Sequence, residues 1–293
     1  MQYDKTSREV LLQDKRVVNI GRGGINDDRI TDDAQQRAMR AIKEFRDSID
    51  RYGAMEVFAF ATSAFRNAEN GPSLRDKIRE ACNISIEIIS GNDEAEFIFW
   101  GVNAAMDLGS TTSLVMDIGG GSVEFIIGKK DQVKWKRSFE IGAQRLLDLF
   151  HHHDPILPNE IETLKDHLDR ELADLFTAFA KYNPTTLVGS SGTFDTLSAI
   201  YYRQKGMEIT PQLTETLLPM EDYKKIHAEL VSKNREERMK IPGMIGMRVD
   251  MIVVASCIID LLLQKHEFNR IRVSTYSLKE GVLAQIVDGK LLH

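Results

Sequence analysis

The stretch that decides the fold is L-V-M-D-I-G-G-G-S-V-E-F-I-I, residues 114–127. Two apolar runs typical of β-strands flank the glycines, which predicts a hairpin with an open turn. Glycine tolerates positive φ and has no Cβ, so successive backbone N–H groups can converge on one phosphate group. An ordinary tight hairpin that uses glycine for its dihedral angles is the alternative, because short glycine motifs are weak signals. The flanking strands and the S-x-E continuation favour phosphate.

Charged and hydroxyl side chains border these glycines. Asp117 stands where the first strand ends, and Ser122 and Glu124 open the return strand. The two-residue period of a strand puts Ser122 and Glu124 on the same face. Mg²⁺ prefers carboxylate, water and phosphate oxygens as ligands. A carboxylate on each side of a phosphate-sized turn therefore suggests a divalent metal that bridges protein and phosphate.

Composition limits the class of protein. The chain has 293 residues, enough for two lobes at about 100–200 residues per domain. Its net charge of −6 argues against a nucleic-acid partner, which usually needs a basic surface. Cys82 and Cys257 lie in apolar settings and are interpreted as buried thiols in a reducing cytoplasm. The N-terminus does not resemble a signal peptide, and the longest apolar run, 251–263, is too short to span a bilayer, so no membrane partner is expected.

Two candidate residues follow strands in the first part of the chain. Strand–helix alternation in two blocks predicts an α/β protein with a cleft between lobes. A buried strand is expected at Met55–Ala61, and Arg66 lies in the polar segment after it, where ligands gather in α/β sheets. A solvated surface arginine is the alternative. A strand at 84–89 leads into S-G-N-D-E-A-E, in which Glu94 is a candidate to orient a water molecule.

The second part of the chain contains another strand followed by a small-residue turn, T-L-V-G-S-S-G-T at 186–193. Such a turn at a helix N-terminus is a second candidate anion site, with a turn that serves only packing as the alternative. The H-H-H-D run at 151–154 invites a metal hypothesis. Three adjacent histidines cannot all face one ion in a regular element, so a solvated loop is favoured. One long helix is expected at 158–180. The apolar helix at 251–263 is assigned to the core, with a homodimer interface as the alternative.

Seven ordered blocks together resemble the exopolyphosphatase / guanosine pentaphosphate phosphohydrolase (Ppx/GppA) family. The resemblance implies the actin-like ATPase (ribonuclease H-like) fold, an α/β architecture of two lobes with substrate in the groove between them, in a short form. It places lobe I at 1–107 together with a C-terminal helix at 278–293, and lobe II at 108–277. The blocks are A-T-S-A-F-R-N-A (61–68), I-I-S-G-N-D-E-A-E-F (88–97), M-D-I-G-G-G-S-V-E-F (116–125), F-E-I-G-A-Q-R-L (139–146), V-G-S-S-G-T (188–193), I-P-G-M-I-G-M-R-V-D (241–250) and V-S-T-Y-S-L-K-E-G-V-L (273–283).

The resemblance also implies roles for single residues. Glu94 corresponds to the family's catalytic glutamate, which activates the attacking water, and Arg66 binds a phosphate near it. Asp117 and Glu124 correspond to ligands of Mg²⁺, and a monovalent cation is an additional cofactor to expect. The residues that correspond to phosphate-binding positions are Gly119, Gly120, Gly121, Ser122, Gly189, Ser191, Gly192 and Thr193.

One element of the family pattern is not found in this sequence. Members of the family open with a strand–turn–strand that carries D-x-G-[ST]-N, a phosphate loop that mirrors the one at 117–122. The first β run here, at 8–20, matches the family's third strand. We expect either that the start is clipped or that this member has lost the hairpin. The catalytic activity of this chain depends on which of these two explanations holds.

The function favoured by the sequence is hydrolysis of terminal phosphoanhydride bonds in inorganic polyphosphate or pppGpp, with water as acceptor. The two substrates present the same terminal bond, so the sequence does not discriminate between them. A catalytically impaired protein that binds phosphate or an alarmone is the alternative. A phosphotransferase like the sugar kinases of this fold is a third hypothesis, and the S-G-N-D-E-A block argues against it.

Overall fold

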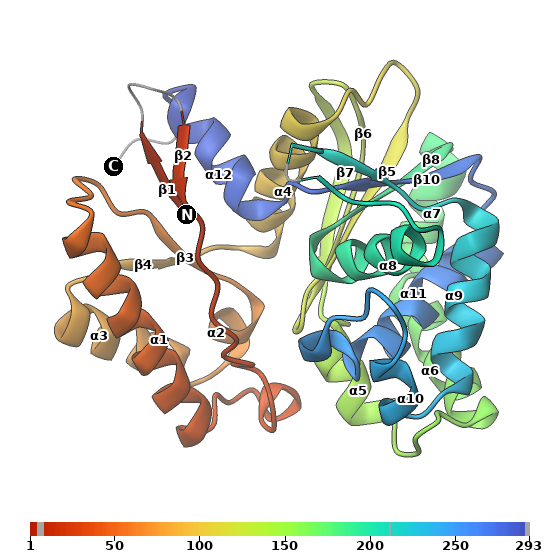
Figure 1. Ribbon diagram of the computed structural model, residues 1–293, viewed down its shortest axis with the longest axis horizontal. Coiled ribbons are helices and arrows are strands. Elements are labelled where there is room, and N and C mark those ends of the chain that lie inside the picture. Colours follow the sequence, from red (N-terminus) through yellow and green to blue (C-terminus); the bar gives the residue numbers. More distant parts are fainter. Residues whose placement is uncertain (5–8, 211, 291–293) are drawn as a thin grey trace. The chain divides into compact units, whose positions relative to one another are not determined.

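The computed structural model describes residues 1–4, 9–210 and 212–290, and the chain divides into two compact units, 1–90 and 91–293 (Figure 1). The predicted division differs in two helices. Both α4 (Gly91–Ala105) and α12 (Leu278–Val287), which were predicted to belong to lobe I, are part of unit 2. The reason is packing, because α4 and α12 contact each other extensively and α4 also lies against strands of unit 2.

Unit 1 contains two pairs of short strands and three helices longer than a single turn. Its core lies between α1 and α3, where Ala34, Leu74 and Ile78 are buried. The hydroxyl of Thr31 accepts a hydrogen bond from the amide of Ala34 at 3.3 Å, so Thr31 is the N-cap of α1. The elements are β1 (Gln2–Asp4), β2 (Glu9–Leu12), the 3-10 turn η1 (Ile25–Asp27), α1 (Asp32–Arg51), β3 (Ala59–Ala61), α2 (Ser63–Asn67), α3 (Gly71–Cys82) and β4 (Ile86–Ile88).

The buried strand expected at Met55–Ala61 is largely wrong. Only Ala59–Ala61 is a strand, and Met55 is 99% exposed. Within the described residues β3 pairs in parallel with β4 alone, through Ala59–Ala61. The apolar residues at 55–58 lie outside this pairing, so the strand is shorter than predicted.

Unit 2 is built on a six-stranded sheet in the order β7-β6-β5-β8-β10-β9. Strands β5, β8 and β10 run parallel, and the other three pair antiparallel. The helix expected at 158–180 is two helices, which meet at Leu172. The elements are β5 (Ser113–Ile118), β6 (Val123–Lys129), β7 (Gln132–Phe139), α5 (Ala143–Phe150), α6 (Pro158–Glu171), α7 (Ala173–Tyr182), β8 (Thr186–Ser190), α8 (Ser191–Gln204), β9 (Glu215–Leu217), α9 (Met220–Ser232), α10 (Arg235–Met239), the 3-10 turn η2 (Gly246–Arg248), α11 (Met251–Lys265) and β10 (Arg270–Ser274).

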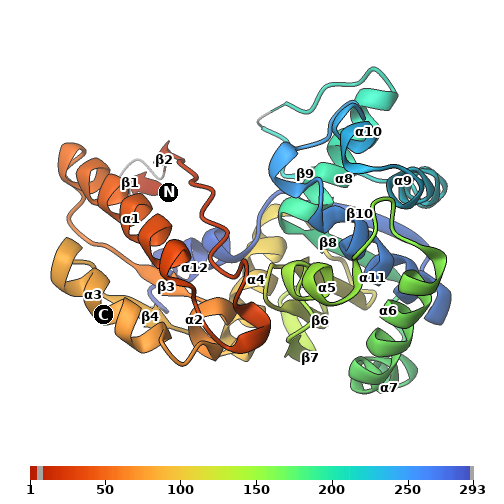
Figure 2. The same ribbon diagram turned by 90° about the horizontal axis from the view of Figure 1, so that it is seen from below.

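Alternating residues of the sheet face two different groups of helices (Figures 1 and 2). Leu114 and Met116 of β5 pack with residues of α5, α8 and α11 in the larger core. Val115 of β5 and Val188 of β8 pack with α4 on the opposite face. The helix α11 is buried along most of its length, as predicted. In the described ranges 1–4, 9–210 and 212–290, no helix has the length and apolar character needed to cross a membrane.

The helices α4 and α12 touch through their backbones. A Cβ at Gly101 of α4 would lie 2.1 Å from the carbonyl oxygen of Ser277, and one at Gly281 of α12 would lie 1.7 Å from that of Phe97. Real Cβ atoms do not approach oxygen so closely, so only glycine fits at both positions. The contact joins α4, which carries the candidate residue Glu94 in its first turn, to the segment in which Ser277 immediately precedes α12.

We therefore expect Gly281→Ala to push α12 away from α4. The added methyl group should lower the free energy of unfolding by about 1–3 kcal/mol, the usual cost of overpacking. Urea denaturation followed by circular dichroism measures this. Lys279→Ala, on the exposed side of the same helix, is the control and should change stability by less than about 0.5 kcal/mol. Equal stability of Gly281→Ala and the parent protein would contradict the close contact.

Candidate functional site

The glycine turn between β5 and β6 has its carbonyl groups engaged and its amides available. The carbonyls of Gly119, Gly120 and Gly121 accept hydrogen bonds from the amides at the start of α5, at 2.9–3.1 Å for the closest partners. Gly121 O also accepts from Nε of Arg145 at 3.0 Å. Within the described residues, the amides of Gly120, Gly121 and Ser122 donate no backbone hydrogen bond. Three adjacent free N–H groups are what the predicted phosphate-binding turn would need to hold an anion.

Side-chain alternation places two carboxylates beside this turn on the α4 face of the sheet. Asp117 and Glu124 are directly paired across β5 and β6. They share the face of Val115 and Ile126, which pack against α4. Both side chains are almost fully buried, at 5% and 1% exposure. The structure therefore brings the two predicted metal ligands together.

Hydroxyl groups from distant parts of the chain surround Asp117. Its Oδ2 accepts hydrogen bonds from Ser190 Oγ at 2.9 Å and from Ser277 Oγ at 2.5 Å. The Ser191 hydroxyl and the charge of Arg248 also stabilise the ionised form, but burial outweighs them and raises the pKa of Asp117. The sequence analysis missed Ser190 and Ser277. Ser190 is the last residue of β8 and pairs with Asp117 of β5, a strand-end position that could have found it, whereas Ser277 lies beyond β10, immediately before α12.

The carboxyl group of Glu124 is held close to two other carboxylates. Burial raises its pKa well above the usual value, and the nearby charges of Glu94 and Asp117 raise it further. Hydroxyls of Ser122 and Ser138 oppose this, and Ser138 Oγ donates to Glu124 Oε1 at 2.6 Å. Glu94 is itself 7% exposed in the first turn of α4. The structure thus places Glu94 near the glycine turn within unit 2.

The second small-residue turn lies at the N-terminus of α8, where Ser191 has a φ of 70°. A non-glycine residue in the left-handed region is uncommon and is often found at functional sites. The guanidinium of Arg248 lies against Gly192, because a Cβ there would be 2.4 Å from Nη2. Arg248 was missed by the sequence analysis, although it lies in a block that carries the resemblance. Arg248 adds a cation beside Asp117. Burial lowers the pKa of Arg248, and the negative charge of Asp117 opposes this.

Two of the predicted phosphate-binding positions in this turn are buried in the protein. Gly189 lies under the ring of Phe194, since a Cβ would be 2.0 Å from Cδ1. The Thr193 side chain is 2% exposed. For Gly189 the close contact with Phe194 is sufficient to explain the glycine. Ser191 and Gly192, by contrast, lie next to Asp117 and Arg248 and belong to the same cluster.

Arg66 lies in unit 1, in the short helix α2, and its Nη1 donates to the carbonyl of Ile89 at 3.1 Å, just after β4.

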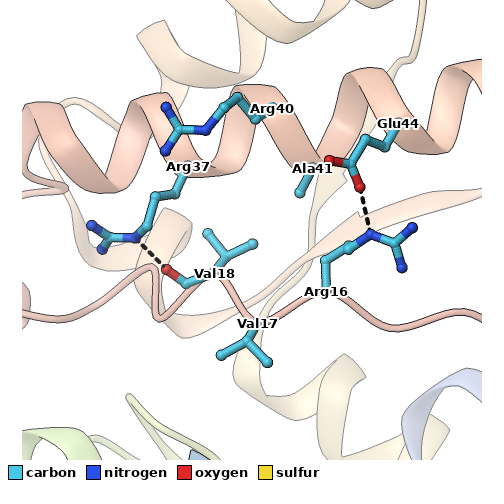
Figure 3. A pocket seen from close by; sticks show the side chains of 7 residues that line it. All are labelled: Arg16, Val17, Val18, Arg37, Arg40, Ala41 and Glu44. Atoms are coloured by element: carbon cyan, nitrogen blue, oxygen red, sulfur yellow. Dashed lines mark hydrogen bonds and ion pairs between the residues drawn. The ribbon is translucent and has the colours of Figure 1, made fainter.

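Unit 1 also has a pocket of about 230 Å³ (Figure 3), and Arg66 does not line it. Cations in this pocket have partners of their own. Arg16 Nε donates to Glu44 at 2.5 Å and Arg37 Nε to the carbonyl of Val18 at 2.8 Å. The lining is Arg16, Val17, Val18, Arg37, Arg40, Ala41 and Glu44.

The charge distribution at Asp117 and Glu124 fits a bound divalent cation. Asp117 and Glu124 are both buried and the charge of Asp117 raises the pKa of Glu124, so a positive charge between them would stabilise the pair. In the part of the chain that the structure describes, no three histidine, cysteine, aspartate or glutamate side chains are placed to hold a metal together. Water and phosphate oxygens would therefore have to complete the ligand set, which is the usual arrangement for Mg²⁺.

Comparisons with known proteins agree with this geometry. The family model described as the Ppx/GppA phosphatase family matches residues 1–290. A crystal structure of an exopolyphosphatase from Cytophaga hutchinsonii is 44% identical, with a TM-score of 0.92 over 95% of this chain and 90% of that one. Exopolyphosphatase 1 of Mycobacterium tuberculosis is 26% identical over 89% of this chain and 76% of its own length. The guanosine-5'-triphosphate,3'-diphosphate pyrophosphatase of Photobacterium profundum is 23% identical over 98% of this chain and 56% of its own length. The predicted resemblance to the Ppx/GppA family is confirmed, and the α/β fold is that of solved structures of this family.

The charge repulsion at Glu124 predicts an unusual pH dependence of stability in metal-free buffer. Its pKa is higher in the folded than in the unfolded chain, so the folded state binds more protons and stability falls as pH rises above the usual value of 4.5. Glu124→Gln should therefore raise the unfolding temperature at pH 7, and the gain should shrink towards pH 4.5. Differential scanning calorimetry in EDTA measures this. Glu208→Gln removes an exposed charge and should leave the unfolding temperature unchanged. A lower unfolding temperature for Glu124→Gln at pH 7 would contradict the repulsion.

Proposed function

Because the chain belongs to the Ppx/GppA phosphatase family, we propose that it hydrolyses the terminal phosphoanhydride bond of inorganic polyphosphate or of pppGpp. The observation that carries the proposal is the position of Glu94. This buried carboxylate lies near enough to Glu124 for its charge to raise the pKa of Glu124, which pairs with Asp117 next to the free amides of the glycine turn. A phosphate held by those amides would therefore lie close to a carboxylate that can accept a proton.

The glycine turn and the second turn supply the binding of the phosphate chain. Amides of Gly120, Gly121 and Ser122 would donate to phosphate oxygens, as would the first amides of α8, whose N-terminus favours negative charge. Arg248 lies against Gly192 and would contribute a full positive charge on the same side. Donors fixed before the substrate arrives stabilise the charge that develops on the terminal phosphoryl group.

Glu94 would act on the attacking water. Its carboxylate accepts a hydrogen bond from the water and takes one proton as the water oxygen bonds to the terminal phosphorus. The bond from that phosphorus to the bridging oxygen breaks at the same time, and the shortened chain leaves with the electron pair. One inorganic phosphate is released in each cycle. Glu94 lies in the first turn of α4 and is 7% exposed.

Asp117 and Glu124 would hold Mg²⁺, with water and phosphate oxygens as the remaining ligands. When bound, the ion neutralises charge on the phosphate chain. The serine hydroxyls on both carboxylates orient them for this task, because each hydroxyl fixes one carboxylate oxygen. Arg66 is proposed to bind a further phosphate.

Glu94→Gln tests the assignment of the base. The substitution keeps the size of the side chain but removes the proton acceptor, so phosphate release from tripolyphosphate should fall by about 10²–10⁴-fold. A malachite-green assay for released phosphate measures the rate, and calorimetry measures binding. Asp93→Asn is the matched control, since Asp93 is exposed in the same helical turn, and it should keep the parent rate within about twofold.

The outcome also separates hydrolysis from binding alone. Unchanged phosphate release by Glu94→Gln would remove Glu94 from the mechanism. A parent protein that binds tripolyphosphate and pppGpp but releases no phosphate from either would be a binding protein of the same fold, and the proposal of hydrolysis would then be wrong.

The metal proposal has its own test, which uses Glu124→Gln. Loss of one carboxylate ligand should raise the Mg²⁺ concentration needed for half-maximal activity by at least about 10-fold. Titration of EDTA-treated protein with Mg²⁺ measures this, with Glu208→Gln again as the control. Full activity in EDTA, or the same Mg²⁺ requirement for both variants, would contradict the assignment.

A further inference from the structure

Arg238 in α10 is a buried cation with partners from several segments. Its side chain is 1% exposed. Nη1 donates to Asp154 Oδ1 at 2.7 Å and to the carbonyl of Lys233 at 2.5 Å, and Nε donates to the carbonyl of Val249 at 3.0 Å. A guanidinium withdrawn from water is unfavourable unless such partners replace the solvent. One of these partners, Val249, lies in the loop that follows α10.

Residues 240–250 form the loop that connects α10 to α11. Arg238 lies just before the loop begins, and Val249 lies just before it ends. The hydrogen bond from Arg238 Nε to Val249 O therefore joins the two ends of the loop. Inside the loop, the amide of Arg248 donates to the carbonyl of Ile245 at 2.8 Å, which forms the turn η2.

The loop is closely fitted against α8 at two points. Gly243 has a φ of +93°, and a Cβ there would lie 2.5 Å from the carbonyl oxygen of Ala199. The guanidinium of Arg248 lies against Gly192 at the start of the same helix. Since consecutive Cα atoms are about 3.8 Å apart, a shift of Val249 would move Arg248 with it.

We infer that Arg238, held by Asp154, is a positioning residue for Arg248. The inference rests on the proposed function, in which Arg248 contributes charge to the phosphate site. Arg238 closes the loop at its ends, and the closed loop fixes the backbone from which Arg248 reaches Gly192 and the neighbourhood of Asp117. Arg238 is too deeply enclosed by these partners to serve as a substrate ligand itself.

Asp154 also fixes the orientation of α10. Its second oxygen, Oδ2, accepts a hydrogen bond from the amide of Arg235 at 2.6 Å, at the first residue of that helix. Asp154 belongs to the H-H-H-D run that the sequence predicts to be a solvated loop. That prediction is wrong for His151, whose side chain is 5% exposed with Nε2 at 3.9 Å from Asp154 Oδ1. Residues 151–154 therefore do not face solvent throughout, and Asp154 at the end of the run holds Arg238.

A double-mutant cycle tests the inference. Lysine cannot donate to Asp154, Lys233 and Val249 at once, so Arg238→Lys should lower kcat/KM for tripolyphosphate about 10- to 100-fold. In an Arg248→Met background the same substitution should change kcat/KM by less than about twofold, because the residue through which it acts is gone. Asp154→Asn, which keeps the size of the side chain, should show the same pattern if Arg238→Lys folds poorly.

Asp260→Asn is the matched control. It breaks the ion pair of Asp260 with Lys165, at 2.6 Å, which lies in the same unit but makes no hydrogen bond to the loop. Its effect on kcat/KM should be equal in both backgrounds. The inference is overturned if Arg238→Lys and Asp154→Asn lower kcat/KM by the same factor with and without Arg248, or if both keep the parent value.

Hydrogen–deuterium exchange gives a readout that does not depend on activity. Amides of 240–250 should exchange faster in Asp154→Asn than in the parent protein, while those of 117–125 stay unchanged. If the parent releases no phosphate, the proposed function fails and exchange alone decides whether Arg238 holds the loop. Unchanged exchange at 240–250 would contradict the inference even in an active enzyme.

Discussion

The structure of unit 2 depends on one electrostatic constraint, the confinement of Asp117, Glu124 and Glu94 to the same buried region. Burial and mutual repulsion raise the pKa of Glu124, so the arrangement is unfavourable by itself. The protein offsets part of this with hydroxyl donors. Ser138, Ser190 and Ser277 come from three different strands or strand ends and each donates to a carboxylate. Such a site gains most from a ligand that brings positive charge and further donors.

The backbone turns beside these carboxylates are also arranged around the need for hydrogen-bond donors. At the glycine turn, α5 uses the carbonyl groups and leaves amides free. At the second turn, Ser191 has a left-handed conformation that is uncommon for a residue with a Cβ. Both turns follow strands of one sheet, β5 and β8, which are parallel neighbours. Parallel pairing therefore brings the two turns proposed to bind phosphate together although they lie far apart in the sequence.

The sequence was sufficient to predict those parts of the candidate site whose residues lie close together in the chain. Asp117, the glycine turn and Glu124 lie within eight consecutive residues, and the pairing of Asp117 with Glu124 across the hairpin puts both carboxylates on one face. The resemblance added Glu94, which the structure places near Glu124. The residues that were missed are non-local. Arg248 and Ser277 reach Asp117 from other elements, and no periodic pattern links them to it. The error at Met55 has a related cause, because burial of a strand depends on partners that lie elsewhere in the chain.

The backbone contact between α4 and α12 couples two functional groups mechanically. Glycine at 101 and 281 leaves no flexible side chain between the helices to absorb a displacement. The α12 helix extends about 1.5 Å per residue from Leu278 to Val287 and begins next to the hydroxyl that donates to Asp117. A rotation of α12 would therefore move its N-terminal end next to Asp117 and Glu124. A small tilt imposed at the far end of this helix would be felt as a change in hydrogen-bond length at Asp117, tens of residues away along the backbone and without any contact with the substrate.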